Sequence, residues 1–232
     1  MIYQGTGANT TGTGTQIGTS DFNSSYNNNM YVGYMYGSGV HGLTSSSTIK
    51  GILDNWYRDN LATNYGNKID GNAGFCGDRE PSTSTSSSNG SGGTGTTTTY
   101  YGAYIRLVNS NKNPTFECKN ESDLYTTSGS EQGNQSLTYP IGLITADEVA
   151  YAGGVYPTNN TSYFLYTGQH YWTMSPYGFN YGNAYVLYVY LNGRLSDAGM
   201  DDTLGVRPVI NLKANVQITE GNGSSSNPYV IA

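Results

Sequence analysis

Charged side chains are scarce in this sequence. Lys and Arg contribute 10 residues and Asp and Glu 16, so that only 11% of the 232 residues are charged and the formal net charge is −6. Soluble domains ordinarily carry about a quarter of charged residues. Solubility must therefore come from Ser, Thr, Asn and tyrosine hydroxyls. The acidic balance leaves no basic stripe to neutralise phosphates, which excludes nucleic acid as an expected partner.

Histidine is almost absent as well. The two histidines are His41, in a glycine-rich turn, and His170, beside aromatic residues. Nucleophilic hydrolysis needs a base next to the nucleophile, and no serine lies in a nucleophile-elbow pattern between a strand and a helix. Two histidines and two distant cysteines do not have the spacing of a zinc or iron site. We therefore expect no catalytic residues, no metal site and no enzymatic activity.

The acidic residues offer two weaker alternatives. Glycoside hydrolysis needs two carboxylates at a defined separation, and nothing in the sequence places any two of Asp78, Asp147 and Glu148 there. Calcium prefers several carboxylates in a short loop, and the residues that offer them are Asp197, Asp201 and Asp202. A solvated loop explains the last three residues equally well, so no cofactor is expected and calcium stays the alternative.

Long apolar runs are missing too. No stretch approaches the roughly 18 apolar residues that span a bilayer, and residues 1–20 lack a basic start followed by an apolar core. Any export signal or membrane anchor is therefore expected to lie outside this sequence. Residues 1–29, rich in Gly, Thr, Asn and Ser, are predicted to form a flexible or extended leader before a single domain over 30–232.

Glycine and tyrosine are abundant, with 32 and 23 copies. Tyr, Ser, Gly and Asn dominate antibody binding surfaces, because rigid aromatic area loses little conformational entropy and small polar residues adapt their hydrogen bonds. An ordinary β-rich extracellular protein would show a similar composition. Composition therefore suits a binding surface but does not prove one.

Two helices are predicted in the first two thirds of the chain. The segment TIKGILDNWYRDNL over 48–61 has apolar residues at spacings of three to five, after a serine or threonine cap. Thr145 and Glu148 form a capping box that opens a short helix, which Gly153 and Gly154 end. Strands are predicted at 31–36 and 100–108, and an extended segment at 137–143.

Predicted strands become dense after residue 163. They read SYFLYT, QHYWTMSP, NAYVLYVYL, GVRPVINLK and NPYVIA. Asn192 and Gly193 give the clearest hairpin turn signal, directly after the longest of these runs. The pattern predicts an α+β fold with two short helices and antiparallel strands concentrated in the C-terminal third.

Cys76 and Cys118 flank a Ser/Gly/Thr-rich stretch over 81–99. In an oxidising compartment the two cysteines would pair, close a loop of about forty residues and stabilise the fold by roughly 3 to 4 kcal/mol. The stretch is then an insertion inside one domain rather than a linker between two. Two unrelated buried thiols are the alternative.

Several spaced motifs resemble known microbial surface proteins. The motifs are GFCGDRE, PTFEC, LTYPIGLITADEVAYAGG, YWTMSP, GVRPVINLK and NPYVI. Together they resemble tyrosine-rich surface proteins, many of which begin with a prepilin-like helix, and the variable proteins of diversity-generating retroelements. The resemblance implies a C-type-lectin-like fold related to formylglycine-generating enzymes. It also implies a C-terminal surface in which template-directed randomisation changes chosen codons on a fixed framework.

The resemblance divides the C-terminal region, about 177–203, into framework and variable positions. Trp172 is expected to anchor the core, and Arg207 to pair with a carboxylate or carbonyls. The expected ligand-binding positions lie between framework segments and are Tyr177, Phe179, Asn180, Tyr181, Leu187, Tyr188, Tyr190, Arg194, Ser196, Asp197, Ala198, Asp201 and Asp202. Ordinary surface strands and loops are the alternative interpretation of this set.

The resemblance implies a protein on the cell surface or outside the cell that binds a protein or glycan on another cell or particle. The first alternative is a structural minor pilin or adhesin subunit without diversification. The second is an enzyme of the formylglycine-generating type, which needs a reactive cysteine pair. Cys76 and Cys118 suit a structural bridge better, because a long insertion separates them.

Overall fold

A computed structural model describes residues 1–231 except 8–10, 37–43, 83–98, 110–111 and 225. Its helices are η1 (Thr13–Thr15), η2 (Asn29–Tyr31), α1 (Thr48–Asn60), α2 (Ala62–Tyr65), η4 (Gly66–Lys68), the π-helical η6 (Tyr104–Asn109), η7 (Glu121–Asp123) and α3 (Ala146–Ala152). Its strands are β1 (Gly18–Ser20), β2 (Phe75–Cys76), β3 (Thr99–Tyr100), β4 (Leu124–Tyr125), β5 (Tyr171–Asn180), β6 (Asn183–Val189), β7 (Leu195–Gly199), β8 (Leu204–Val206), β9 (Ile218–Glu220) and β10 (Val230–Ile231). The fold is α+β, as the pattern predicted.

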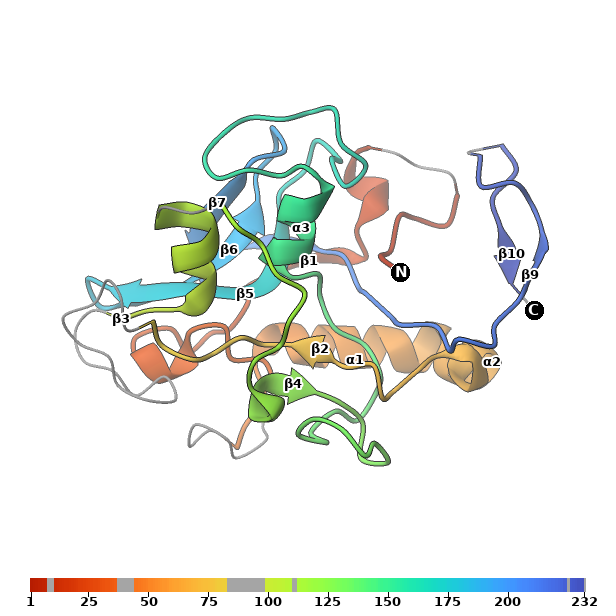
Figure 1. Ribbon diagram of the computed structural model, residues 1–232, viewed down its shortest axis with the longest axis horizontal. Helices are drawn as coiled ribbons and strands as arrows, with labels where there is room; N and C mark the ends of the chain where they lie inside the picture. The colour runs from red at the N-terminus through yellow and green to blue at the C-terminus, as the bar shows by residue number, and fades with distance from the viewer. Residues whose placement is uncertain (8–10, 37–43, 83–98, 110–111, 225, 232) are drawn as a thin grey trace.

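The central sheet contains six strands, mainly from the C-terminal third. Its order is β1-β8-β5-β6-β7, with β3 beside β5. The pairs are antiparallel except β5 with β8, which run parallel. β9 and β10 form a separate hairpin that Figure 1 shows beside the body of the molecule.

The two longest strands, β5 and β6, are rich in apolar residues, and their side chains are mostly buried on both faces of the sheet. β5 carries Trp172, which has no exposed surface and donates from Nε1 to the Ser20 carbonyl at 2.9 Å. This confirms its expected role in the core. The β6–β7 turn lies where Asn192 and Gly193 predicted it, and Gly193 has φ 82°, a conformation that favours glycine.

The N-terminal segment is part of the domain, which corrects the prediction of a flexible or extended leader. β1 pairs with β8, and the Tyr3 amide donates to the Pro208 carbonyl at 2.8 Å. Phe22 is fully buried and meets Trp172 edge-on at 5.5 Å between ring centroids. The prediction failed because these buried residues are isolated among glycines and polar residues and form no apolar pattern. The residues that bury them lie far along the chain.

Three strand predictions are wrong. The segment SYFLYT over 162–167 forms turns and bends before β5, with no strand pairing. Within 31–36 the described residues form a turn after η2, although Tyr34, Met35 and Tyr36 are buried. The segment 100–108 begins in β3 but continues as the π-helical η6. Its alternation of aromatic and aliphatic residues fits a strand, but its tyrosines pack against each other: Tyr100 and Tyr104 stack at 4.2 Å.

The helix predictions are confirmed. α1 buries Ile49, Leu53 and Tyr57 along one stripe. At α3, Thr145 accepts from the Glu148 amide while the Glu148 carboxylate accepts from the Thr145 amide, and Gly153 ends the helix in a left-handed conformation.

The disulfide between Cys76 and Cys118 is present, with Cα atoms 5.6 Å apart. The predicted insertion at 81–99 lies mostly outside the described residues. Its described flanks lie side by side, because the Ser82 amide donates to the Tyr100 carbonyl at 2.7 Å. No described helix is long and apolar enough to cross a membrane.

Candidate functional site

The predicted ligand-binding positions do not form one surface. Leu187 pairs with Asp197 and Tyr188 with Ser196 across β6 and β7, and successive residues of a strand point to opposite faces. One face therefore carries Tyr177, Leu187 and Asp197, whereas the other carries Tyr188 and Ser196. The remaining positions lie at the edges, in the β5–β6 turn and in the loop before β8.

Four of these positions are buried, which corrects the prediction that they line a surface. Leu187 has no exposed surface, and Phe179, Tyr188 and Ala198 expose 7%, 8% and 7% of theirs. In this conformation they support the sheet and cannot contact a ligand through most of their side chain. An alanine at Tyr188 would therefore disturb folding as well as any binding.

A second group belongs to an aromatic cluster under η6. Tyr177 contacts Tyr104 edge-on at 5.1 Å. Asp197 accepts from the Tyr156 hydroxyl at 2.9 Å. Burial raises the pKa of Tyr156 to about 12, and the Asp197 charge adds to this, so the hydroxyl stays a donor at neutral pH. Tyr177 and Asp197 therefore have structural partners.

The exposed positions lie at two ends of the sheet. Tyr181 is 97% exposed in the β5–β6 turn, next to the half-buried Asn180. Asp201 and Asp202 are exposed in the loop after β7. Within the described residues no group of three or more metal-ligating side chains is found, so nothing here assigns calcium to these aspartates.

The remaining predicted positions, Tyr190, Arg194 and Ser196, lie on the β6–β7 hairpin. We call them, together with the buried Tyr188 and with His170, which was not among the predicted positions, the hairpin cluster. The His170 ring meets Tyr190 edge-on at 4.5 Å and stacks on Tyr188 at 5.7 Å. The Arg194 guanidinium lies over the Tyr190 ring at 4.5 Å. The cluster combines aromatic faces with a cation on a hairpin that the sheet holds rigid.

Two polar atoms of the hairpin cluster have no hydrogen-bond partner. They are Nδ1 of His170 and Nε of Arg194, and both are buried. Unpartnered buried polar atoms are rare in folded proteins, since each loses its hydrogen bonds to water. Burial lowers the pKa of His170, which keeps the ring neutral at pH 7. The sequence analysis placed His170 in a strand and gave it no role in binding. Its neighbours in the cluster are about twenty residues away in the chain, so no local pattern indicates them.

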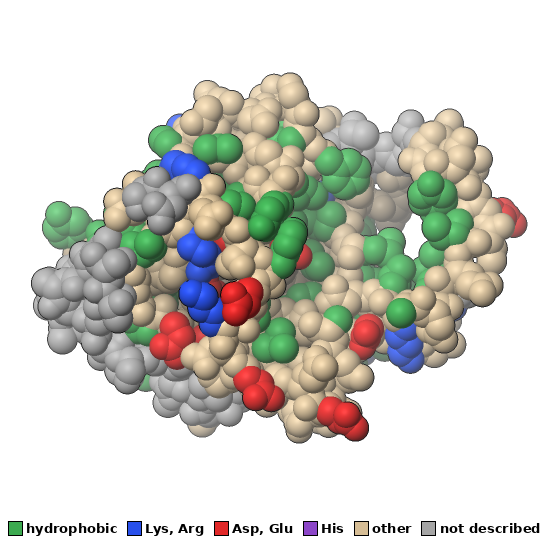
Figure 2. Space-filling model, in the orientation of Figure 1, with side chains coloured by type: hydrophobic (Ala, Val, Ile, Leu, Met, Phe, Trp, Pro, Cys, Tyr) green, Lys and Arg blue, Asp and Glu red, His purple; other side chains and the backbone are tan. Residues whose placement is uncertain are grey.

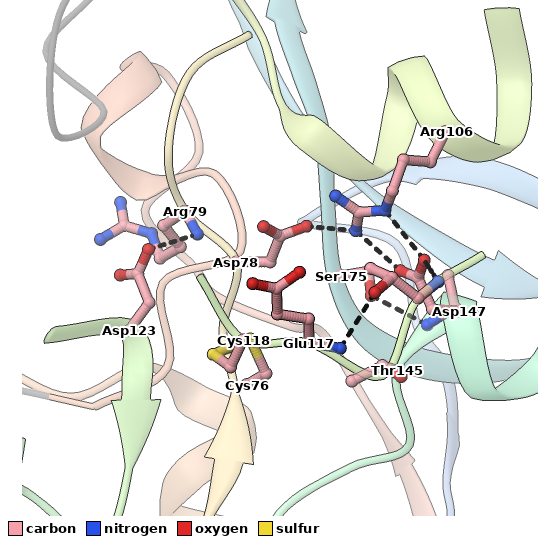
Figure 3. A network of polar contacts seen from close by, with 12 residues as sticks. Cys76, Asp78, Arg79, Arg106, Glu117, Cys118, Asp123, Thr145, Asp147 and Ser175 are labelled. Atoms are coloured by element: carbon pink, nitrogen blue, oxygen red, sulfur yellow. Dashed lines mark hydrogen bonds and ion pairs between the residues drawn. A yellow bond between two sulfur atoms is a disulfide. The ribbon is translucent and has the colours of Figure 1, made fainter. Parts of the chain in front are cut away.

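A second site, which the sequence did not reveal, lies between η6, α3 and the disulfide (Figure 3). Arg106 donates from Nε and Nη2 to the two oxygens of Asp147, at 2.9 and 2.8 Å. Its Nη2 also donates to Asp78 at 2.6 Å. The Thr115 amide donates to the same Asp147 at 2.9 Å. One guanidinium thus holds two carboxylates that are 69 residues apart in the chain.

Burial and charge set the titration of this network. Burial raises the pKa of Asp78 in spite of the neighbouring Arg106. Burial alone would lower the pKa of Arg106, but hydrogen bonds to Asp147 and the charge of Asp78 outweigh it and raise that pKa. Asp78 also has φ 47°, a strained conformation for an aspartate. Perturbed and strained charged groups in a cleft are typical of functional sites.

The network lines a cavity of about 160 Å³, which we call the acidic cavity. Leu143, Met174 and the Cys76–Cys118 bridge contribute to its wall. Its charged lining residues are Asp78, Arg106, Glu117, Asp147 and Glu148. A neighbouring cavity of about 280 Å³ shares Asp78, Arg106 and both cysteines with it. Figure 2 shows basic and acidic side chains side by side on this face, between η6 and β4, with hydrophobic side chains over α3.

A nearby pair of buried charges is structural. The Asp123 carboxylate accepts from the Arg79 amide at 2.8 Å (Figure 3), and Arg79 Nε donates to the Val32 carbonyl at 2.9 Å. Arg207 likewise donates to the carbonyls of Leu165 and Tyr3, which confirms its predicted pairing with carbonyls.

Comparisons with family models, with curated proteins and with solved structures found no match for this chain.

Proposed function

We propose that this protein binds a protein or glycan ligand at the cell surface or outside the cell through its hairpin cluster. The C-terminal sheet is proposed to be a C-type-lectin-like scaffold. The observation that carries the proposal is the pair of unpartnered buried atoms, His170 Nδ1 and Arg194 Nε, beside the Tyr190 ring. These atoms have almost no accessible surface in this conformation, so a ligand would supply their missing hydrogen bonds only after the Tyr190 and Arg194 side chains moved aside. Tyr and Arg are frequent among binding hot spots.

The proposal includes diversification by a retroelement. A fixed sheet supports this idea physically, because β5, β6 and β7 pair through backbone hydrogen bonds that do not depend on which side chains the exposed positions carry. Tyr190, Arg194 and Ser196 then accept substitution, whereas Leu187 is confined to apolar residues by its burial.

Deep sequencing of the gene's last third in its source population tests the diversification. We expect substitutions at Tyr181, Tyr190, Arg194, Ser196, Asp201 and Asp202, little variation at Leu187 and Ala198, and a near-copy repeat beside the gene. A uniform sequence would overturn diversification and favour a structural pilin or adhesin subunit.

Binding itself is tested with the whole protein on arrays of printed glycans and of surface proteins. The double variant Tyr190→Ala, Arg194→Ala should lose the signals that the wild type gives. The matched control Phe164→Ser, at a side chain that is 81% exposed outside the cluster, should keep them. Equal signals from both variants, with the fold retained, would overturn the proposed site.

A further inference from the structure

Two aromatic side chains stand exposed at the rim of the acidic cavity. Phe116 exposes 72% of its surface and Tyr151, from α3, exposes 53%. Their rings stack at 4.1 Å with an interplanar angle of 13°, and the Tyr151 hydroxyl donates to the Pro114 carbonyl at 3.0 Å. The two rings cover one face of each other, and the rest of the pair is exposed apolar surface that the Tyr151 hydrogen bond holds in place.

The carboxylates beside this aromatic pair favour a cationic ligand. The acidic cavity has four carboxylates and one guanidinium in its wall, and Phe116 lines it as well. Arg106 is already engaged by Asp78 and Asp147. The neighbouring Glu117 has no ion-pair partner among the described residues, and Figure 3 shows its carboxylate near that of Asp78. An anionic ligand would be repelled here, and a cation would relieve the excess of negative charge.

We propose that the Phe116–Tyr151 pair and the acidic cavity dock an arginine side chain presented by a partner protein. A guanidinium is planar, so it stacks on an aromatic face and pairs with a carboxylate through two hydrogen bonds at the same time. Arg106 with Asp147 already shows the second of these geometries in the cavity wall.

The size of the cavity agrees with a single side chain. Its volume of about 160 Å³ is below the roughly 300 Å³ at which sites for drug-sized ligands begin. The exposed aromatic area outside the cavity must then be covered by the surface that presents the arginine, which is why the partner is a protein. This surface is distinct from the hairpin cluster, so the arginine site and the proposed ligand site at the hairpin cluster can be tested independently of each other.

The test is an NMR titration of the isotope-labelled full chain with a short Gly/Ser peptide that carries one central arginine. The control peptide replaces the arginine with citrulline, which has the same shape without the charge. We expect saturable shifts at the amides of Phe116, Glu117 and Tyr151, and at least about tenfold weaker binding of the citrulline peptide. No binding of the arginine peptide up to about 10 mM, or equal binding of both peptides, would overturn the proposal.

Paired variants locate the site. Glu117→Gln and Phe116→Ser change exposed side chains and should each weaken binding of the arginine peptide by about two- to fivefold, the size expected for an exposed ion pair or cation–π contact. Glu131→Gln and Phe164→Ser are the matched controls at exposed positions elsewhere and should bind as the wild type does. An equal loss in the controls would show a general charge effect and contradict the assigned site.

Discussion

The C-terminal region over 171–206 and the front region over 1–140 are held together in different ways. In the C-terminal region, long strands pair with their neighbours in the chain, and β5, β6 and β7 follow one another through short turns. In the front region, the strands have two or three residues, and side chains make the connections. The comparison teaches that local sequence pattern determines the structure of the C-terminal region, whereas contacts between distant residues determine that of the front region.

Buried arginines illustrate the second mode. Arg79 has no exposed surface and reaches carbonyls in the turn after η2, including Val32, which is 47 residues away. Its guanidinium lies over the Tyr34 ring at 5.2 Å. A buried charge is tolerated only when it is paired or hydrogen-bonded, so each such contact fixes two distant segments to one another.

The largest expected effect is in the C-terminal region. Trp172→Ala removes a fully buried ring and its bond to Ser20, and should lower the free energy of unfolding by about 3 to 5 kcal/mol. Urea denaturation followed by far-UV circular dichroism measures this. Trp56→Ala, at a partly buried position in α1, should cost less. A larger loss for Trp56 would mean that the front region, not the sheet, dominates stability.

The disulfide tests the front region. The double variant Cys76→Ser, Cys118→Ser opens a link across 42 positions and should cost about 3 to 4 kcal/mol. Adding Trp56→Phe leaves Trp172 as the only tryptophan, so its fluorescence reports on the sheet alone. We expect fluorescence and circular dichroism to lose their native signals together in urea. Separate transitions would show that the two regions unfold independently and would contradict the interpretation of the chain as one domain.

Much of the C-terminal region could be predicted from the sequence. Trp172 and the Asn192–Gly193 turn follow from a strong apolar pattern and from adjacent residues. The Thr145–Glu148 capping box, which precedes this region, is local in the same way. The prediction failed for Leu187 and Ala198 because they lie in β6 and β7, where successive side chains alternate between the two faces of the sheet. Alternation alone does not tell which face another segment covers.

The front region and the acidic cavity were mostly beyond prediction. Asp78 and Asp147 were weighed, with Glu148, as paired carboxylates for glycoside hydrolysis, but nothing in the sequence placed them together. Arg106, the single basic residue of YYGAYIRLV, was a signal that the segment is not an ordinary strand, but its partners are 28 and 41 residues away. Contacts of this kind leave no periodic trace in the sequence.

A smaller effect is expected at the helix that joins the two regions. Thr145→Ala removes the hydroxyl that accepts from the Glu148 amide and should cost about 1 kcal/mol. Thr158→Ala, at an exposed position after the same helix, should change stability little. Equal urea midpoints for the two variants would show that the capping box does not contribute.

The smallest effect concerns pH at the hairpin cluster. Burial lowers the pKa of His170 in the folded protein, so below about pH 6.5 the unfolded chain binds this proton first. The unfolded state then binds more protons, and the stability due to this group falls as the pH falls through that value. His170→Gln should therefore lose less stability than the wild type between about pH 7 and 5.5, measured as the difference in urea midpoint. Parallel losses would mean that His170 titrates as it does in the unfolded chain. The hairpin would then be more open to water than the rest of the sheet, and the unpartnered Nδ1 would no longer point to a ligand.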